Sequence, residues 1–353
     1  MEKRTRLIYL ERTIMKIRCF AAAAMSLLLC GASQAQTPAA SLSTEALGMT
    51  CDRACLTSIM DKYLAALIAH NPTQLDLATH VKFTENGVVL PPGTALWQTA
   101  TGLGSFKQYF VDPKGHSVGF LGTIKERNTK SVLSVRLKLQ DSVIQEIEQI
   151  VLRNPQSAIA WEERVEPGKR AFTTADWNAT LTPAERVPRD RMIAITNTYF
   201  SAIQGGAATP VPFAADCYRI ENGGVTSGAP KTGPDAPEQA DGAVFVNSVA
   251  TQTCAQQLSV KGFFVFNNEL RDRRFLVVDE EKGIVYAHVF FDHAGKFTES
   301  ILPDGTRRPV TGRVALPSTL AIHEMFWIKN GVIQHIAANL LGVPYGMGSG
   351  WEK

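Results

Sequence analysis

Residues 53–87 read RACLTSIMDKYLAALIAHNPTQLDLATHVKFTENG, and residues 189–223 read RDRMIAITNTYFSAIQGGAATPVPFAADCYRIENG. The two stretches align without a gap, so that Tyr63 falls on Tyr199 and both stretches end in Glu-Asn-Gly. Each predicts an amphipathic helix, a short second helical stretch, and a strand that enters a turn. The spacing between the copies is too long for a solenoid repeat, so the sequence predicts a duplicated domain.

A run of strands follows each copy. In the first half, a short helix is predicted at 105–111, before strands at 116–124, 131–139 and 144–152. In the second half, a loop rich in Gly and Pro precedes predicted strands at 262–267, 275–278, 283–292, 320–328 and 332–340. Helices followed by strands joined by hairpins predict an α+β fold with mostly antiparallel sheets. In this alignment Glu324 falls on Glu148, and the tail at 342–351 is expected to pack back on the second domain.

The amino terminus indicates export. A basic segment at 15–18 precedes an apolar run at 19–30 and the small residues at 31–35. This order is typical of a secretory signal with cleavage after Ala35, and 1–14 is read as an upstream extension. Lipidation of Cys30 is the alternative. A periplasmic or secreted protein is expected, with the boundaries signal peptide 1–35, first domain 50–155, linker 156–188 and second domain 189–353.

Composition narrows the class of function. The chain of 353 residues is 45% hydrophobic and 20% charged with a net charge of +3, which is typical of ordinary packed domains. Lys and Arg are not clustered, so no nucleic-acid partner is expected. No apolar run is long enough to span a bilayer comfortably. The fingerprints of dinucleotide-binding folds, P-loops and serine-esterase elbows are absent, so no redox or nucleotide cofactor is expected.

Four cysteines remain once the signal is removed. An even number of cysteines in an exported chain favours disulfides over metal binding or catalysis. Cys217 in a predicted strand is paired with Cys254 beyond the long loop, and Cys51 with Cys55, one helical turn away. A nucleophilic cysteine is the alternative.

The order of these elements resembles a known superfamily. A Tyr-x-x-Ala helix, a short second helix, a strand that ends in an acid and a turn, and hairpin strands are similar to nuclear-transport-factor-2-like proteins, including the SnoaL-like and ketosteroid-isomerase-like ones. The Glu-Asn-Gly turns, RRFLVVDEEKGIV at 273–285 and YGMGSGW at 345–351 resemble a subfamily of exported tandem-repeat proteins. The resemblance implies two tandem cone-like domains, each a curved sheet wrapped around its amino-terminal helix, packed together as a pseudo-dimer.

The resemblance also implies site residues. In ketosteroid isomerases, a tyrosine of the first helix donates a hydrogen bond to the substrate oxygen, and Tyr63 and Tyr199 match that position. The position of the catalytic aspartate matches Asn222, which cannot act as a base, and the adjacent Glu221 is the candidate to take its role. The alternative is that these residues tie the helix to the strand and cap the turn.

Histidines distinguish the second half. His288 and His323 lie in predicted strands and are candidate acids or bases beside aromatic residues. The candidate substrate-binding residues are Tyr63, Arg274, Tyr286, Phe290, Trp327 and His335. A metal site that includes Asp292 or Glu324 is an alternative, but no histidine spacing supports it and no metal is predicted. A buried histidine that only makes structural hydrogen bonds is the simpler interpretation.

The expected function is that of an exported, cofactor-independent enzyme of lyase, isomerase or hydrolase type. It would move a proton on a small, partly apolar organic molecule in the second domain, where Tyr199 polarises an oxygen and His288 or Glu221 carries the proton. The alternative is a non-catalytic protein that binds a small molecule. Either form is expected as a monomer or a homodimer.

Overall fold

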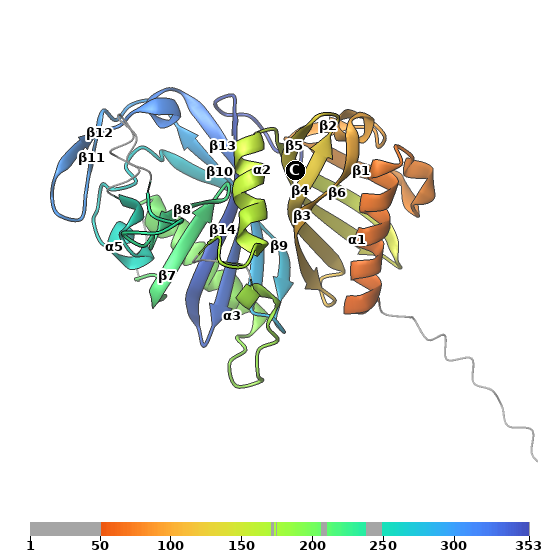
Figure 1. Ribbon diagram of the computed structural model, residues 1–353, viewed down its shortest axis with the longest axis horizontal. Coiled ribbons are helices and arrows are strands. Elements are labelled where there is room, and N and C mark those ends of the chain that lie inside the picture. Colours follow the sequence, from red (N-terminus) through yellow and green to blue (C-terminus); the bar gives the residue numbers. More distant parts are fainter. Residues whose placement is uncertain (1–50, 171–172, 174, 206–209, 238–248, 353) are drawn as a thin grey trace, which may run out of the picture. The chain divides into compact units, whose positions relative to one another are not determined.

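The computed structural model describes residues 51–352 except 171–172, 174, 206–209 and 238–248 (Figure 1). The predicted signal peptide and Cys30 therefore lie outside the described residues. Residues Gly48–Lys353 form one compact unit. Among the helices of the described part, none is long and apolar enough to cross a membrane.

Two six-stranded sheets form the α+β fold, and their strand orders are the same. In the first half, α1 (Arg53–Ile68) precedes a sheet ordered β2-β1-β6-β5-β4-β3. Its strands are β1 (Leu77–Glu85), β2 (Val88–Leu90), β3 (Ala100–Asp112), β4 (Ser117–Glu126), β5 (Thr129–Gln140) and β6 (Val143–Leu152).

In the second half, α3 (Arg189–Ile203) precedes a sheet ordered β8-β7-β14-β13-β10-β9. Its strands are β7 (Phe213–Glu221), β8 (Gly224–Ser227), β9 (Glu269–Asp279), β10 (Ile284–His293), β13 (Ser318–Lys329) and β14 (Val332–Val343). The short helix α5 (Cys254–Leu258) and the ribbon of β11 (Glu299–Ile301) and β12 (Arg307–Pro309) complete this half. The matching orders fit two tandem domains.

Both sheets are mixed. The last strand of each half returns beside the first and runs parallel to it, β6 beside β1 and β14 beside β7, while the other neighbours pair antiparallel. The predicted Glu-Asn-Gly turns are confirmed, because Asn86 and Asn222 have φ of 53° and 51° and a glycine with positive φ follows each. The prediction of mostly antiparallel pairing holds for every neighbouring pair except these two.

Two predicted elements are wrong. Residues 105–111 belong to β3 instead of a helix, because Phe106, Gln108 and Phe110 are buried at every second position. Residues 262–267 form turns before β9, instead of a strand. The short second helical stretch of the first half is the 3-residue η1 (Pro72–Gln74), which ends before β1 begins.

The predicted equivalence of Glu324 with Glu148 is also wrong. Glu148 lies on β6, whose counterpart is β14, whereas Glu324 lies on β13, the counterpart of β5. The glutamate of the Glu-Asn-Gly turn lies opposite Gln149 and then Val135 in the first sheet, and opposite Ala338 and then Glu324 in the second. Glu324 therefore occupies the place of Val135.

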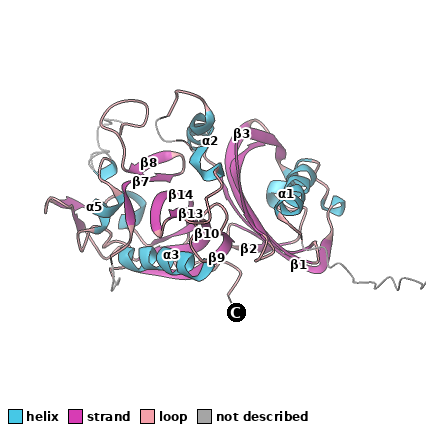
Figure 2. Ribbon diagram, turned by 90° about the horizontal axis from the view of Figure 1, so that it is seen from below, coloured by secondary structure: helices cyan, strands magenta, loops and turns pink. Residues whose placement is uncertain are grey.

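Each sheet has a helix on one face, α1 on the first and α3 on the second (Figure 2). A separate apolar cluster joins the opposite faces of the two sheets through residues such as Phe110 and Tyr286, whose rings lie 5.6 Å apart. The segment predicted as a linker contributes Trp161 and Trp177 to this cluster, and both are buried. It begins with the helix α2 (Pro155–Glu162).

Both predicted disulfides are confirmed. Cys51 is bonded to Cys55 at the start of α1, and Cys217 on β7 is bonded to Cys254 at the start of α5. Two disulfides fit a protein of an oxidising, extracellular compartment.

The tail after β14 does not pack on the second sheet alone. The Trp351 indole N–H donates to Thr84 Oγ1 at 2.9 Å, and the ammonium of Lys82 lies 4.5 Å from the centre of the indole ring. Both partners belong to β1, so the tail of the second half covers a strand of the first. The prediction that the tail packs back on its own domain holds for Gly346 and Met347, which bond to Thr319 at 3.0 Å and to Arg271 at 2.7 Å. It does not hold for Trp351, which contacts the first half.

Candidate functional site

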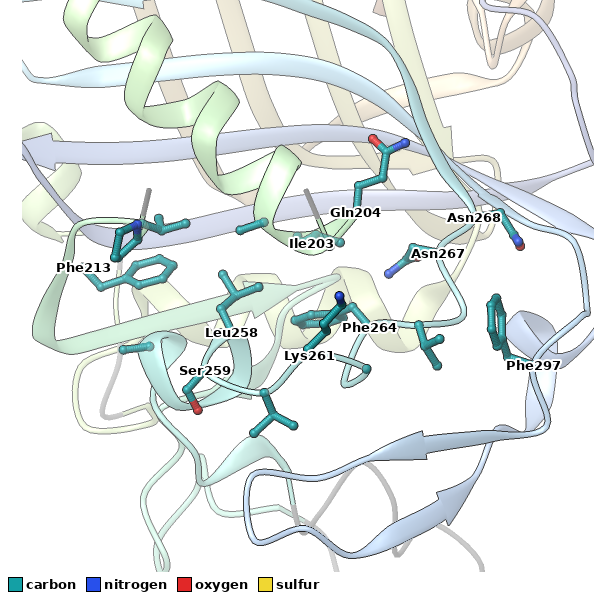
Figure 3. Close-up of a pocket in the computed structure, with 18 residues that line it drawn as sticks. Ile203, Gln204, Phe213, Leu258, Ser259, Lys261, Phe264, Asn267, Asn268 and Phe297 are labelled. Atoms are coloured by element: carbon teal, nitrogen blue, oxygen red, sulfur yellow. The ribbon is translucent and has the colours of Figure 1, made fainter. Parts of the chain in front are cut away.

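A pocket of about 890 Å³ opens in the second half. It lies between the carboxyl end of α3, the start of β7, α5, and the segment 259–268 (Figure 3). Its volume falls in the range of small-molecule sites. Figure 3 shows Phe213 and Leu258 at one end of the pocket and the amide side chains of Asn267 and Asn268 at the other. The lining also includes Phe297 beside Asn268 and, nearer the middle, Lys261, so it suits a small, partly apolar molecule.

A buried polar network lies next to this pocket. The hydroxyl of Tyr199 donates to Glu324 Oε1 at 3.1 Å, and Arg219 Nη1 donates to the Tyr199 oxygen at 3.4 Å. Arg219 Nη2 also donates to Gln257 Oε1 at 2.8 Å. The second carboxyl oxygen of Glu324, Oε2, is buried and has no hydrogen-bond partner among the described residues. One oxygen of the network is thus left for a further group.

Two aromatic side chains lie between the pocket and the network. Phe213 and Phe264 line the pocket. The ring of Phe213 lies 6.3 Å from that of Tyr199, and the guanidinium of Arg219 lies 5.7 Å from the ring of Phe264. Ile203, also in the lining, follows Tyr199 by one turn of α3. The network therefore lies directly behind the pocket wall.

Burial sets the protonation of this network. It raises the pKa of Glu324 to about 8, against the opposing effect of the Arg219 guanidinium. It also raises the pKa of the Tyr199 hydroxyl well above its usual value, and the neighbouring Glu324 acts in the same direction. Tyr199 is therefore a hydrogen-bond donor at neutral pH, and Glu324 is a carboxyl group that can give or take a proton near neutral pH.

The predicted residues of the Glu-Asn-Gly turn lie at the edge of this network. Glu221 Oε1 is 2.8 Å from Arg219 Nε, and the side chain of Glu221 is 30% exposed. The amide of Asn222 bonds the backbone of Leu340 at both ends, accepting from its N–H at 2.8 Å and donating to its carbonyl at 3.0 Å. Asn222 thus ties the turn to β14, which agrees with the structural alternative for this residue.

Tyr63, the counterpart of Tyr199 in the first half, bonds to a different set of side chains. The Tyr63 hydroxyl donates to Gln149 Oε1 at 2.7 Å, and Gln149 Nε2 donates to Glu85 Oε2 at 2.9 Å. Glu85 also pairs with Arg153 at 2.9 Å and accepts from the backbone N–H of Leu96 at 3.0 Å. Tyr63 and Glu85 therefore make structural hydrogen bonds within the first half.

The predicted histidines lie on the other face of the second sheet. His323 Nδ1 is 2.7 Å from the Tyr286 hydroxyl and 2.9 Å from Ser134 Oγ of the first half. Arg274 forms two hydrogen bonds with Glu148, at 2.6 and 2.7 Å, and His288 Nδ1 lies 3.6 Å from the same carboxylate. Successive residues of a strand face opposite sides, so His323 faces the first half while its neighbour Glu324 faces α3. The histidines and Tyr199 are therefore not brought together.

The remaining predicted residues also lie on this face. The ring of Phe290 is 4.8 Å from that of His288. The rings of Trp327 and His335 are 5.0 Å apart, and His335 stacks on Tyr218 at 3.9 Å. None of Tyr286, Phe290, Trp327 and His335 is among the described residues that line the second-half pocket. Their expected role in that pocket has no geometric support.

Sequence reasoning missed Arg219 and Gln257, and considered Glu324 only as a metal ligand. One signal was present for Glu324, because it is an acidic residue in the middle of the apolar run LAIHEMFWI at 320–328. A charge at such a position is buried and needs a partner. The partner itself, Tyr199 on α3, is visible only in the fold.

A known family model matches part of the second half. Residues 185–340 match the model of a family described as a domain of unknown function (DUF8021). The match begins just before α3 and ends within β14, so it includes the pocket and its polar network. No curated protein matches the chain.

Proposed function

We propose that the protein is an exported enzyme of the nuclear-transport-factor-2-like superfamily. Its second half would bind a small, partly apolar organic molecule and move a proton on it without a cofactor. The observation that carries this proposal is the buried Glu324 carboxyl, bonded to Tyr199 directly behind a pocket of about 890 Å³. A buried acid with a pKa near neutrality beside a tyrosine donor is a typical acid–base arrangement.

The fold supports the superfamily assignment. Each half has an amino-terminal helix on one face of a sheet, and in each sheet the last strand pairs in parallel with the first. The inter-sheet cluster around Phe110 and Tyr286 supports packing as a pseudo-dimer. In the proposal each sheet curves around its helix as a cone, and the substrate binds in the pocket of the second half.

The proposed chemistry follows from the two side chains. Tyr199 donates its hydrogen bond to a carbonyl or hydroxyl oxygen of the substrate, which stabilises negative charge that develops there. Glu324 takes a proton from the neighbouring carbon and returns it elsewhere on the molecule, which gives an isomerase, or to a departing hydroxyl, which gives a lyase. Glu324 thus replaces His288 and Glu221 as the proposed proton carrier. The substrate must displace the ring of Phe213 or Phe264, because these rings separate the pocket from the network.

The second candidate is a binding protein without chemistry. The same two rings favour it, because a ligand that leaves them in place contacts the apolar wall and the amides of Asn267 and Asn268 but not Glu324. Its affinity would depend on the pocket lining and would be independent of the carboxyl group.

The test is incubation of the mature protein with a mixture of hydroxylated, carbonyl and aromatic small molecules, followed by mass spectrometry. We expect new products from the wild type, and a loss of roughly 10²-fold or more in rate for Glu324→Gln and Tyr199→Phe. Tyr63→Phe is the matched control, because it removes the equivalent hydroxyl of the first half, and it should keep full activity. If no product forms while some compounds stay bound through dialysis to wild type and Glu324→Gln alike, the binding function replaces the enzymatic one.

A further inference from the structure

We propose that Glu148, His288 and His323 form a binding site for one divalent transition-metal ion of the Zn²⁺ class, which links the two halves of the chain. The site lies on the face of the second sheet opposite α3, so it is separate from the second-half pocket and independent of its proposed function.

The three side chains converge from both sheets. His288 on β10 and His323 on β13 are direct partners across the strand pair, with ring centres 5.5 Å apart. Glu148 comes from β6 of the first half. One ligand atom from each of the three residues lies within 4.8 Å of the others, and all three side chains are at most 4% exposed. Two imidazoles and one carboxylate with an open position are a common ligand set for Zn²⁺ and related ions.

The site leaves buried polar atoms without partners. Both ring nitrogens of His288 and Nε2 of His323 have no hydrogen-bond partner among the described residues. The nearest acidic atoms to His288, Glu148 Oε1 and Asp272 Oδ2, are 3.6 and 3.7 Å away, which is too long for a hydrogen bond. Unpaired buried nitrogens are rare and costly in folded proteins. One such nitrogen from each histidine, close to the Glu148 carboxylate, indicates a ligand between the three side chains.

Neighbouring side chains can orient the two imidazole rings for metal binding. His323 Nδ1 contacts the Tyr286 and Ser134 hydroxyls. In the tautomer in which Nδ1–H donates to one of these oxygens, the lone pair of Nε2 is left for an ion. If His288 binds the ion through Nδ1, on the side of Glu148, its Nε2–H faces Asp272. A carboxylate behind a metal-bound histidine is a common supporting arrangement.

The charge states also fit a cation. Both histidine side chains are buried, and burial disfavours the charged imidazolium form. The Arg274 guanidinium donates a hydrogen bond to each Glu148 oxygen, which favours the ionised carboxylate. Neutral imidazoles and an ionised carboxylate are the forms that bind metals. Each Glu148 oxygen accepts one bond from Arg274 and retains a lone pair for an ion.

The experiment uses the mature protein without an affinity tag, treated with a chelator and dialysed. Co²⁺ is titrated and followed by its visible absorption, and Zn²⁺ by calorimetry. We expect one equivalent to bind and Zn²⁺ to raise the melting temperature. His288→Gln and His323→Gln should weaken binding by at least ~100-fold and abolish the rise in melting temperature. His80→Gln, which removes an exposed histidine on β1, is the control and should bind as the wild type does.

Two results would overturn the proposal. One is the absence of stoichiometric binding to the wild type, which would leave the cluster as a hydrated polar site. The other is binding that both His288→Gln and His323→Gln retain, which would place the ion elsewhere. If these variants do not fold, anomalous diffraction at the zinc edge from wild-type crystals decides the question. A peak between the three side chains supports the site, and a peak only at other positions refutes it.

Discussion

Tyr63 and Tyr199 occupy the same position in the two halves, yet their hydroxyl groups bond to side chains from different strands. Tyr63 donates to Gln149 on β6, and Tyr199 donates to Glu324 on β13. In the second half the place of Gln149 is taken by Ala338, which has no acceptor in its side chain. The duplicated helix therefore keeps its donor while the acceptor changes from a neutral amide to an acid. Two exchanges, Gln149 for Ala338 and Val135 for Glu324, turn a structural hydrogen bond into a pair suited to proton transfer.

The pH dependence of stability tests the protonation of Glu324. Its pKa is about 8 in the folded protein against 4.5 in the unfolded chain, so the folded state holds the proton more tightly. The stabilisation by this proton is complete below about pH 4.5 and is lost as the pH rises to about 8. The free energy of unfolding of wild type relative to Glu324→Gln should therefore fall by about 1.4 kcal/mol per pH unit between pH 5 and 8. Urea denaturation at four pH values measures it.

The control for this measurement is Glu148→Gln, studied with a chelator present. The pKa of Glu148 is lowered to about 2, so its contribution to stability is present above pH 4.5 and is lost only as the pH falls toward 2. Its difference curve should be nearly flat between pH 5 and 8. Parallel curves for wild type and Glu324→Gln across that range would mean that Glu324 is ionised in the folded protein.

Among the elements, α5 and β7 hold the wall of the pocket, and a disulfide joins them. Cys217 and Cys254 are 37 residues apart in sequence, whereas Cys51 and Cys55 are separated by 4. Because a longer closed loop removes more entropy from the unfolded chain, Cys217→Ala/Cys254→Ala should lose about 4 kcal/mol of stability. Cys51→Ala/Cys55→Ala should lose about 2 kcal/mol. Urea unfolding of both double variants measures the difference, and equal losses would argue against loop entropy as the cause.

Side chains of β13 take part in two separate polar clusters, one on each face of the second sheet. His323 faces Ser134 of the first half, and the next residue, Glu324, faces Tyr199 on α3. Because side chains alternate along a strand, a shift of register by one residue would exchange these two groups between the pocket side and the inter-sheet side. The register with β10 and β14 therefore positions both the proposed acid and a proposed metal ligand.

At the scale of the whole unit, the two sheets are packed closely through their facing surfaces. A Cβ at Gly119 on β4 would lie 2.4 Å from Tyr286 Cδ1 on β10 of the other half. Gly119→Ala should therefore destabilise the protein by about 1–3 kcal/mol through overpacking. Gly102→Ala on β3 is the matched control, because its Cβ would meet only Lys125 Cδ at 3.7 Å, and neither glycine has a positive φ.

Thermal and urea unfolding of these two variants test the contact between the halves. Gly102→Ala should be neutral or slightly stabilising, since alanine restricts the unfolded chain more than glycine does. Equal stability of Gly119→Ala and Gly102→Ala would show that the two sheets are not held at this distance in solution.

Features that depend on near neighbours can be predicted from the amino-acid sequence. The spacing of apolar residues at 53–68 and 189–203 predicted α1 and α3, and alternation with turn residues predicted most of the strands. The repeat predicted the matching halves, and the number of cysteines predicted both disulfides. Patterns shorter than one element were misread, because 105–111 and 262–267 have too few residues to separate a helix, a strand and a turn.

The contacts between distant side chains follow from the packing of the fold and could not be predicted from local sequence. Tyr199 was expected beside His288, but it bonds to Glu324, and His288 lies beside Glu148 of the other half. These contacts depend on strand order and register. A shift of one residue or one strand changes the sheet face on which a side chain lies and the partner that it contacts. The tail was likewise assigned to its own domain, because nothing local in the sequence indicates that Trp351 reaches β1. Local sequence determines the helices and strands, and the order, register and packing of the two sheets determine which side chains come into contact.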